Sequence, residues 1–135
     1  MRLTPVYVVS NYRVLLWKLL QERTPDQSIS HKEMPQWAEH VLFVDSKPYR
    51  DWLFIIDGEK VVGSIYITRH NEIGISVFNE HRRKGYAKWA IRQLMIWYDD
   101  DRILANINPK SKASIKLFGE FGFKLVQNTY SLERR

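Results

Sequence analysis

The sequence carries a compact group of cations where a helix is expected to begin. Arg82, Arg83 and Lys84 stand directly before Gly85 and an amphipathic stretch. The first turn of a helix has unpartnered backbone N–H groups and partial positive charge, so cations there do not favour the helix itself. The same N–H groups bind anions, and a glycine lets the backbone come close to one. The segment therefore predicts a phosphate-binding turn, with a basic surface turn as the alternative.

Charge and motif content narrow the choice of anion. The formal net charge of +6 favours a partner such as nucleic acid, an acidic surface or a phosphorylated small molecule. The sequence has neither the G-x-x-x-x-G-K-[ST] nor the G-x-G-x-x-G phosphate motif. Its cations are not interleaved with strand aromatics, which a stacking platform for single-stranded nucleic acid requires. A phosphorylated small molecule is therefore favoured over nucleic acid.

Composition indicates one globular domain over residues 1–135, because 44% of the residues are hydrophobic. The absence of cysteine excludes disulfides and thiolate metal sites. The four histidines show no i, i+4 pair, so we expect no metal site. Polar residues such as Arg13 and Lys18 interrupt the apolar N-terminus, so we expect no signal sequence or membrane span and a cytoplasmic location by default.

The hydrophobic pattern predicts a mixed α/β fold in which strands and helices alternate. Strands are expected at residues 6–9, 51–57, 60–69, 72–78, 102–108 and 122–133. Helices are expected from residue 11, from about residue 31 after a Ser30 cap with Glu33, from residue 84 or 85 to about 98, and over 111–121. The strand, helix and strand passage around residues 72–108 implies one parallel pair within a mostly antiparallel sheet.

Three segments together resemble the GNAT superfamily of N-acetyltransferases. The sequence "RRKGYA" resembles the family signature R/Q-x-x-G-x-G/A, and residues 72–95 resemble its fourth strand, pyrophosphate loop and third helix. Residues 105–123, ending in Gly-Phe, resemble its fifth strand and following helix, and residues 52–69 resemble its second and third strands. The resemblance implies a central sheet of six to seven strands, flanked by about four helices, with one parallel pair.

The resemblance also implies acetyl-CoA as co-substrate, with no metal. Its pyrophosphate would lie on the loop, its pantetheine arm beside the strand, and Asn108 or Ser111 would replace a family asparagine. The cofactor-binding residues implied in this way are Ile75, Val77, Arg82, Arg83, Lys84, Gly85, Tyr86, Ala87, Asn108 and Ser111.

In this family a neutral amine attacks the thioester directly, which requires a base and a donor for the developing oxyanion. Glu72 corresponds to a family position for a catalytic or water-positioning glutamate, and the amide of Val77 would be the donor. The alternative for Glu72 is a solvated carboxylate paired with Arg69 or His70. The family's usual tyrosine acid is replaced by Phe118, which has no proton to give.

The acceptor implied by the resemblance is a primary amine of a small molecule, with an amino sugar or a nucleotide-linked amino sugar favoured. A protein N-terminal or lysine acetyltransferase, a catalytically inactive CoA-binding domain and a nucleic-acid-binding module stay open as alternatives. Trp37, Tyr49 and Trp52 lie in the segment that varies in the family and either line an acceptor pocket or pack the core. We expect no membrane partner, and a homodimer is a possible assembly.

Overall fold

The computed structural model describes residues 1–23 and 34–134 of the chain. Its strands are β1 (Arg2–Pro5), β2 (Asp51–Asp57), β3 (Lys60–Ile67), β4 (Glu72–Val77) and β5 (Leu104–Ala105). Its helices are α1 (Tyr12–Gln21), α2 (Trp37–Asp45), α3 (Tyr86–Trp97) and α4 (Lys112–Glu120), with short 3-10 turns η1 (Val6–Val8) and η2 (Asn79–His81). The strands form one sheet in the order β1-β2-β3-β4-β5, antiparallel except for the β4–β5 pair. The predicted mixed sheet with one parallel pair is confirmed.

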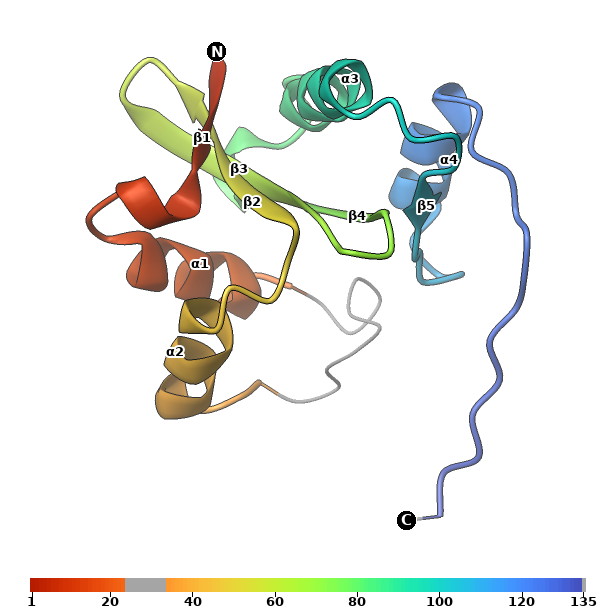
Figure 1. Cartoon of the computed structure of the whole chain (residues 1–135), viewed down its shortest axis with the longest axis horizontal. Coiled ribbons are helices and arrows are strands. Elements are labelled where there is room, and N and C mark those ends of the chain that lie inside the picture. Colours follow the sequence, from red (N-terminus) through yellow and green to blue (C-terminus); the bar gives the residue numbers. More distant parts are fainter. Residues whose placement is uncertain (24–33, 135) are drawn as a thin grey trace.

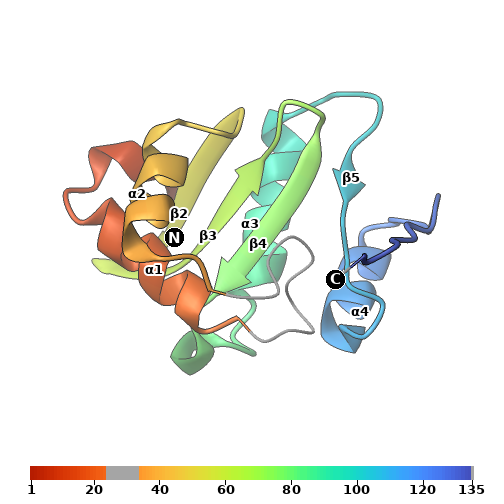
Figure 2. The ribbon, with the colours of Figure 1, turned by 90° about the horizontal axis from the view of Figure 1, so that it is seen from below.

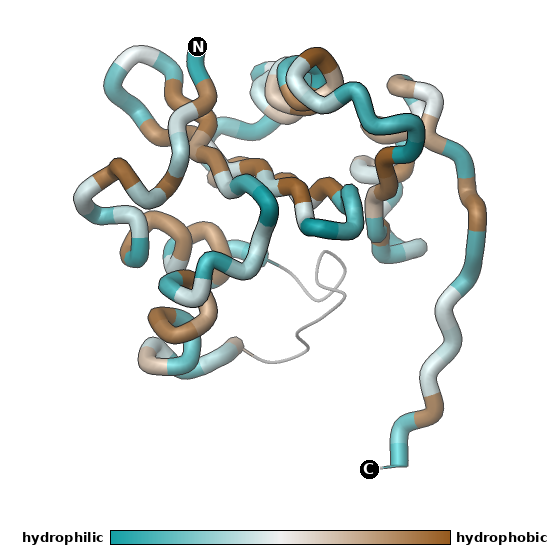
Figure 3. Tube along the Cα trace, viewed as in Figure 1, coloured by the Kyte–Doolittle hydropathy of each residue, from teal (hydrophilic) through white to brown (hydrophobic). Residues whose placement is uncertain are grey.

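Helices cover both faces of this sheet, and each face has its own hydrophobic core (Figure 1). On one face α3 and α4 pack on the strands through Ile91, Leu94 and Phe118. On the opposite face α1 and α2 pack through Leu16, Leu19 and Val44. Figure 3 shows hydrophobic residues concentrated along the central strands and hydrophilic ones in the turns. The alternation along β4 therefore determines which of its side chains face the α1/α2 side and which face α3 and α4.

The predicted strand count is too high. The part of the chain that the structure describes contains five strands, and residues 122–134 form none. They run away from the body as an extended tail, on which Leu125 and Tyr130 are 82% and 89% exposed (Figure 1). The sequence pattern of this tail alternates loosely, and β5 is only two residues long, so it offers little edge for another strand.

The N-terminal elements are shifted from their predicted positions. The first strand is Arg2–Pro5 instead of residues 6–9, because Val6 begins a 3-10 turn that the Val9 N–H closes on the Val6 carbonyl at 3.1 Å. Helix α2 begins at Trp37 instead of residue 31, consistent with Pro35, which disfavours helical backbone before it. Its first turn is closed by a bond from the Gln36 N–H to the Glu39 carboxylate at 3.0 Å. The predicted Ser30 and Glu33 cap lies outside the described residues.

Candidate active site

Strands β4 and β5 are hydrogen-bonded over two residue pairs only, Glu72 with Leu104 and Ile73 with Ala105. Beyond these pairs the two strands diverge, as Figure 2 shows. On its other side β4 stays paired with β3 over five residues, as far as Val77. In the part of the chain that the structure describes, no strand pairs with the other edge of β4 from Gly74 to Val77, next to the parallel junction, and this segment is called the open edge of β4.

The direction of the backbone groups along this open edge follows from the β3–β4 ladder. The Thr68 N–H donates to the Glu72 carbonyl at 2.9 Å, and the Phe78 N–H donates to the Val62 carbonyl at 2.9 Å. In an antiparallel pair such hydrogen-bonded positions alternate with positions whose N–H and C=O point the other way. Ile75 and Val77 occupy the alternate positions, so their amides face the edge of β4 that is not paired with β5.

The open edge leads through η2 into the predicted phosphate loop. Arg82, Arg83, Lys84 and Gly85 are all exposed. Within residues 1–23 and 34–134, Arg83 and Lys84 have no acidic partner, while the Arg82 side chain reaches the Val77 carbonyl at 3.4 Å. Gly85 has φ +84°, and a Cβ there would meet no atom within 4 Å. The backbone at Gly85 therefore needs a glycine and faces open space.

Gly85 is also the N-cap of α3 and supplies no side chain to the first turn. The first helical bond of the turn runs from the Trp89 N–H to the Gly85 carbonyl at 3.0 Å, and the N–H groups before it, including those of Tyr86 and Ala87, have no helical acceptor. The Tyr86 hydroxyl donates to Asp57 at 2.6 Å, a bond that raises the pKa of Tyr86. Tyr86 therefore offers the loop its amide, because its side chain lies against the β2–β3 hairpin.

Glu72 lies at the paired end of β4, on the α1/α2 side. Its carboxylate accepts bonds from the Thr68 hydroxyl at 3.3 Å and from the Asn106 amide. Arg69, one of its predicted ion-pair partners, instead donates to the backbone carbonyls of Pro48 and Lys47. In the described part of the chain no cation contacts Glu72, so the ion-paired alternative is not observed there.

An aromatic cluster, formed by Phe43, Tyr49, Trp52 and Tyr66, lies on the same side of β4. The ring of Tyr66 occupies the position of a Cβ on Gly74, at 2.0 Å, so only glycine fits beneath it. Tyr49 stacks on Tyr66 with ring centroids 3.9 Å apart, and burial raises the pKa of Tyr49 strongly. The indole N–H of Trp52 is buried and has no hydrogen-bond partner among the described residues. The cluster therefore adds aromatic surface and tyrosine hydroxyl groups to the face that carries Glu72.

The residues predicted near α4 have local roles. The Asn108 side-chain oxygen accepts from the Lys110 N–H at 2.9 Å, and its amide nitrogen makes no hydrogen bond to the described residues. Ser111 is the N-cap of α4, and its hydroxyl bonds that of Ser114 at 3.0 Å. Phe118 is 4% exposed and packs on Phe123. The position of the family's tyrosine is therefore a core position in this chain.

Asn106 is a site residue that the sequence reasoning missed. It follows β5 directly and reaches across the junction to Glu72. The available signal was a polar residue at the carboxyl end of a short strand beside the predicted catalytic strand. The expected strand over residues 102–108 concealed this signal, because it placed Asn106 inside the strand.

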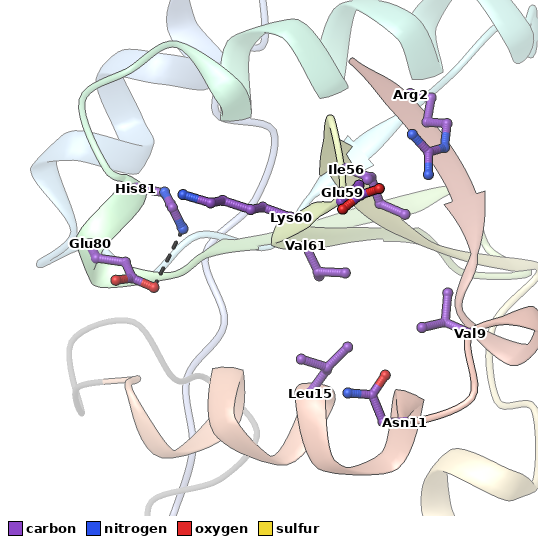
Figure 4. Close-up of a pocket in the computed structure, with 10 residues that line it drawn as sticks. All are labelled: Arg2, Val9, Asn11, Leu15, Ile56, Glu59, Lys60, Val61, Glu80 and His81. Carbon is purple, nitrogen blue, oxygen red and sulfur yellow. Dashed lines mark ion pairs between the residues drawn. The ribbon is translucent and has the colours of Figure 1, made fainter.

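The cavity drawn in Figure 4 has a volume of about 600 Å³ and lies away from this site, between the β2–β3 hairpin, α1 and η2. Its charged lining residues are Arg2, Glu59, Lys60 and Glu80, and none of the predicted site residues lines it. Among the described residues, no group of three or more metal-ligating side chains could hold an ion.

Comparison with known proteins supports the class of protein that this site indicates. The sequence model described as the acetyltransferase (GNAT) family matches residues 11–123. The chain therefore belongs to the GNAT family, whose members are acyltransferases that use acetyl-CoA. Among curated protein sequences no match is found.

Solved structures share the fold at low sequence identity. An aminoglycoside 6'-N-acetyltransferase from Acinetobacter haemolyticus is 16% identical with a TM-score of 0.69, and the match covers 100% of this chain and 99% of that one. A domain from Methanocaldococcus jannaschii is 22% identical with a TM-score of 0.75 and coverages of 95% and 90%. A diaminobutyrate acetyltransferase from Paenibacillus lautus, solved with its substrate and coenzyme A, is 18% identical with a TM-score of 0.54 and coverages of 89% and 72%.

No helix in the described residues is long and apolar enough to span a membrane.

Proposed function

We propose that residues 1–135 act as one N-acetyltransferase domain that transfers the acetyl group of acetyl-CoA to a primary amine of a small molecule. The observation that carries this proposal is the open edge of β4, whose outward amides lead to a helix N-terminus without a side-chain cap. The cations of the loop beside it have no acidic partner among the described residues. A ligand with a linear amide-bearing arm and a pyrophosphate matches both parts. Coenzyme A has both features.

In the proposed complex the pyrophosphate lies on the loop, where the amides of Gly85, Tyr86 and Ala87 donate to it. Arg82, Arg83 and Lys84 add charge-assisted bonds to the phosphates. The pantetheine arm extends β4 as a strand would, bonding the outward N–H groups of Ile75 and Val77 and the C=O group of Ile75. The free amide nitrogen of Asn108 and the Ser111 hydroxyl are the proposed contacts from the α4 side.

The acceptor reaches the thioester from the α1/α2 side, where Glu72 lies. Glu72 removes the amine proton directly or through a water, the new C–N bond forms, and the C–S bond breaks. The departing thiolate takes a proton from water, because Phe118 offers none, and the proton taken up by Glu72 returns to the solvent to neutralise the hydroxide left behind. An outward amide of β4 stabilises the oxyanion that develops after the C–N bond forms and before the C–S bond breaks.

Strand geometry distinguishes the two outward amides. At about 3.3 Å per residue, Glu72 lies roughly 10 Å along the strand from Ile75 and roughly 17 Å from Val77. A glutamate side chain and one water span the first separation but not the second. We therefore propose the Ile75 amide as the oxyanion donor if Glu72 is the base, and the Val77 amide, which the family resemblance implies, if it is not.

Among acceptors, the proposal favours an amino sugar or a nucleotide-linked amino sugar. The aromatic cluster supports a ring-bearing acceptor, since aromatic faces pack on flat apolar surfaces while tyrosine hydroxyl groups donate hydrogen bonds. Two fold relatives are by name acetyltransferases for an aminoglycoside and for diaminobutyrate, which supports a small amine in general. A protein amino group is the second candidate.

The test has two stages. Acetyl-CoA at ~100 times its dissociation constant should stabilise the fold by ~2.7 kcal/mol, which for a chain of this size raises the melting temperature by roughly 10 °C. Thiol release is then measured over amino sugars, diamines and lysine peptides, with an oligonucleotide as competitor. No melting shift at millimolar acetyl-CoA would contradict the cofactor, and binding without turnover on any amine would contradict the transferase.

A further inference from the structure

The contacts around Glu72 assign a role in the reaction to Asn106, in addition to Asn108, which is proposed to contact the cofactor. We propose that Asn106 is a positioning residue, which holds the Glu72 carboxylate at the point where β4 and β5 separate. This inference rests on the proposed function, because it assigns Asn106 its effect through Glu72.

The carboxylate of Glu72 is held from both sides. From the β3–β4 turn, the Thr68 hydroxyl donates to one carboxylate oxygen at 3.3 Å and accepts from the Glu72 N–H at 3.0 Å. From the end of β5, the Asn106 side-chain amide donates to the other oxygen. Each oxygen therefore has its own donor, which limits the rotamers that the side chain can adopt.

Both donors are neutral, and this matters for an amine acceptor. A cation paired with Glu72 would cancel the charge that attracts an ammonium group or receives its proton. The charged groups of this corner are engaged elsewhere: Arg69 bonds the Pro48 and Lys47 carbonyls, and Arg50 pairs with Asp100 at 3.2 Å. Asn106 thus orients the carboxylate without neutralising it.

The backbone under this contact is fixed, which makes the position of Asn106 reproducible. The Leu104 N–H donates to the Asn71 carbonyl at 2.8 Å, immediately before the two-pair ladder of β4 and β5. The Asn71 side chain donates to Asp100 at 3.1 Å and accepts from Arg50 at 3.0 Å. The start of β5 is therefore anchored to the start of β4, and Asn106 is the first side chain beyond the anchor.

The test is a double-mutant cycle on turnover with saturating acetyl-CoA and the best amine of the panel. Asn106→Ala should lower kcat by ~10-fold in the wild-type background and by less than ~2-fold in a Glu72→Gln background, because a positioning residue has no effect without the group it positions. The dissociation constant of acetyl-CoA and the melting temperature are measured for every variant. Thr68→Val is the matched variant for the donor on the other oxygen.

Exchanging the carboxylate and the amide between positions 72 and 106 distinguishes a positioning role of Asn106 from a purely structural one. In Glu72→Gln/Asn106→Asp the amide and the carboxylate exchange places, so the side-chain bond can form again with donor and acceptor reversed. We expect near-native melting temperature and acetyl-CoA affinity with kcat as low as in Glu72→Gln alone. Equal losses of kcat from Asn106→Ala in both backgrounds would overturn the inference and leave the proposed function intact. A wild-type protein that acetylates no amine would overturn both.

Discussion

The two ends of β4 are built differently. At the closed end, Glu72 and Ile73 pair with β5, and Arg50, Asn71 and Asp100 form a hydrogen-bonded network around them. At the open end, from Gly74 through the loop to Ala87, amides face away from the sheet and exposed cations have no acidic partner in the described residues.

The difference between the two ends of β4 indicates where this fold can bind a ligand. Backbone groups of a strand bond a neighbouring strand, a side chain, water or a ligand, so outward amides beside a basic loop can hold an extended anionic ligand. The closed end keeps the two strands together and thereby sets the width of the opening. Substitutions at the open end should change acetyl-CoA binding and turnover. At the closed end, substitution of Glu72 should remove the proposed base, whereas substitutions of the residues around Glu72 should act by changing its position.

The largest expected effect comes from removing one outward amide. Ile75→Pro deletes an N–H that faces the open edge and leaves the β3 ladder bonds in place, a position where a strand tolerates proline. If this amide holds the oxyanion, kcat should fall by ~100- to 1,000-fold. The same change at Val77 should chiefly weaken acetyl-CoA binding. Stopped thiol-release assays and titration of acetyl-CoA measure both quantities.

Two controls accompany this pair. Ile75→Ala measures the loss of the partly buried side chain with the amide retained. Ser76→Pro removes an N–H that faces β3 and should unfold the protein, which checks the assigned direction of the ladder. A larger loss of kcat in Val77→Pro than in Ile75→Pro would move the oxyanion to Val77 and argue against Glu72 as the base.

A smaller effect is expected at the loop glycine. Gly85→Val puts a β-branched residue at φ +84°, with its side chain in the space where the pyrophosphate is proposed. Acetyl-CoA affinity should fall by ~100-fold, roughly the loss of two charge-assisted hydrogen bonds. Gly58→Val is the matched control, since Gly58 has φ +63° and an equally open Cβ position at the hairpin turn. Similar affinity in the two variants would show that the loop does not hold the phosphates.

The sequence was sufficient to predict most of the open end. Its cations, glycine and following helix are contiguous, so local pattern alone places Arg82 to Ala87 on one turn. The hairpin at Gly58 and the parallel β4–β5 pair were likewise predictable from turn chemistry and from the strand, helix and strand order.

The closed end was not predictable in the same way, because it depends on residues far apart in the sequence. Asn106 meets Glu72 across 34 positions, and the length of β5 is set by where its pairing with β4 ceases. The tail after Phe123 has a strand-like pattern but pairs with no strand, since pairing requires a partner that no single-segment pattern reveals.

The loop cations should contribute a moderate and salt-dependent share of acetyl-CoA binding. Arg83→Ala should raise the dissociation constant by ~10-fold at low salt and by less at 0.5 M salt, because exposed charges are screened. Arg92→Ala removes the same charge from an exposed position on α3 outside the loop and should have little effect. Equal effects of the two substitutions would mean that net charge, and not the loop, attracts the ligand.

The smallest expected effect concerns how α4 is held beside the opening. Lys88 on α3 and Glu120 on α4 pair at 3.0 Å, and the hydrogen bond from Lys88 lowers the pKa of Glu120 below its ordinary value of 4.5. A carboxyl whose pKa is depressed by folding adds stability above its unfolded pKa and loses it as the pH falls through the folded value. Glu120→Gln should therefore lower the melting temperature by no more than ~3 °C at pH 7, and the difference from wild type should vanish near pH 3. Acetyl-CoA affinity at pH 7 should be unchanged, because the pair lies outside both ends of β4. A loss of affinity larger than ~3-fold would mean that the position of α4 helps to set the opening, and the division between a closed and an open end would then have to include this helix.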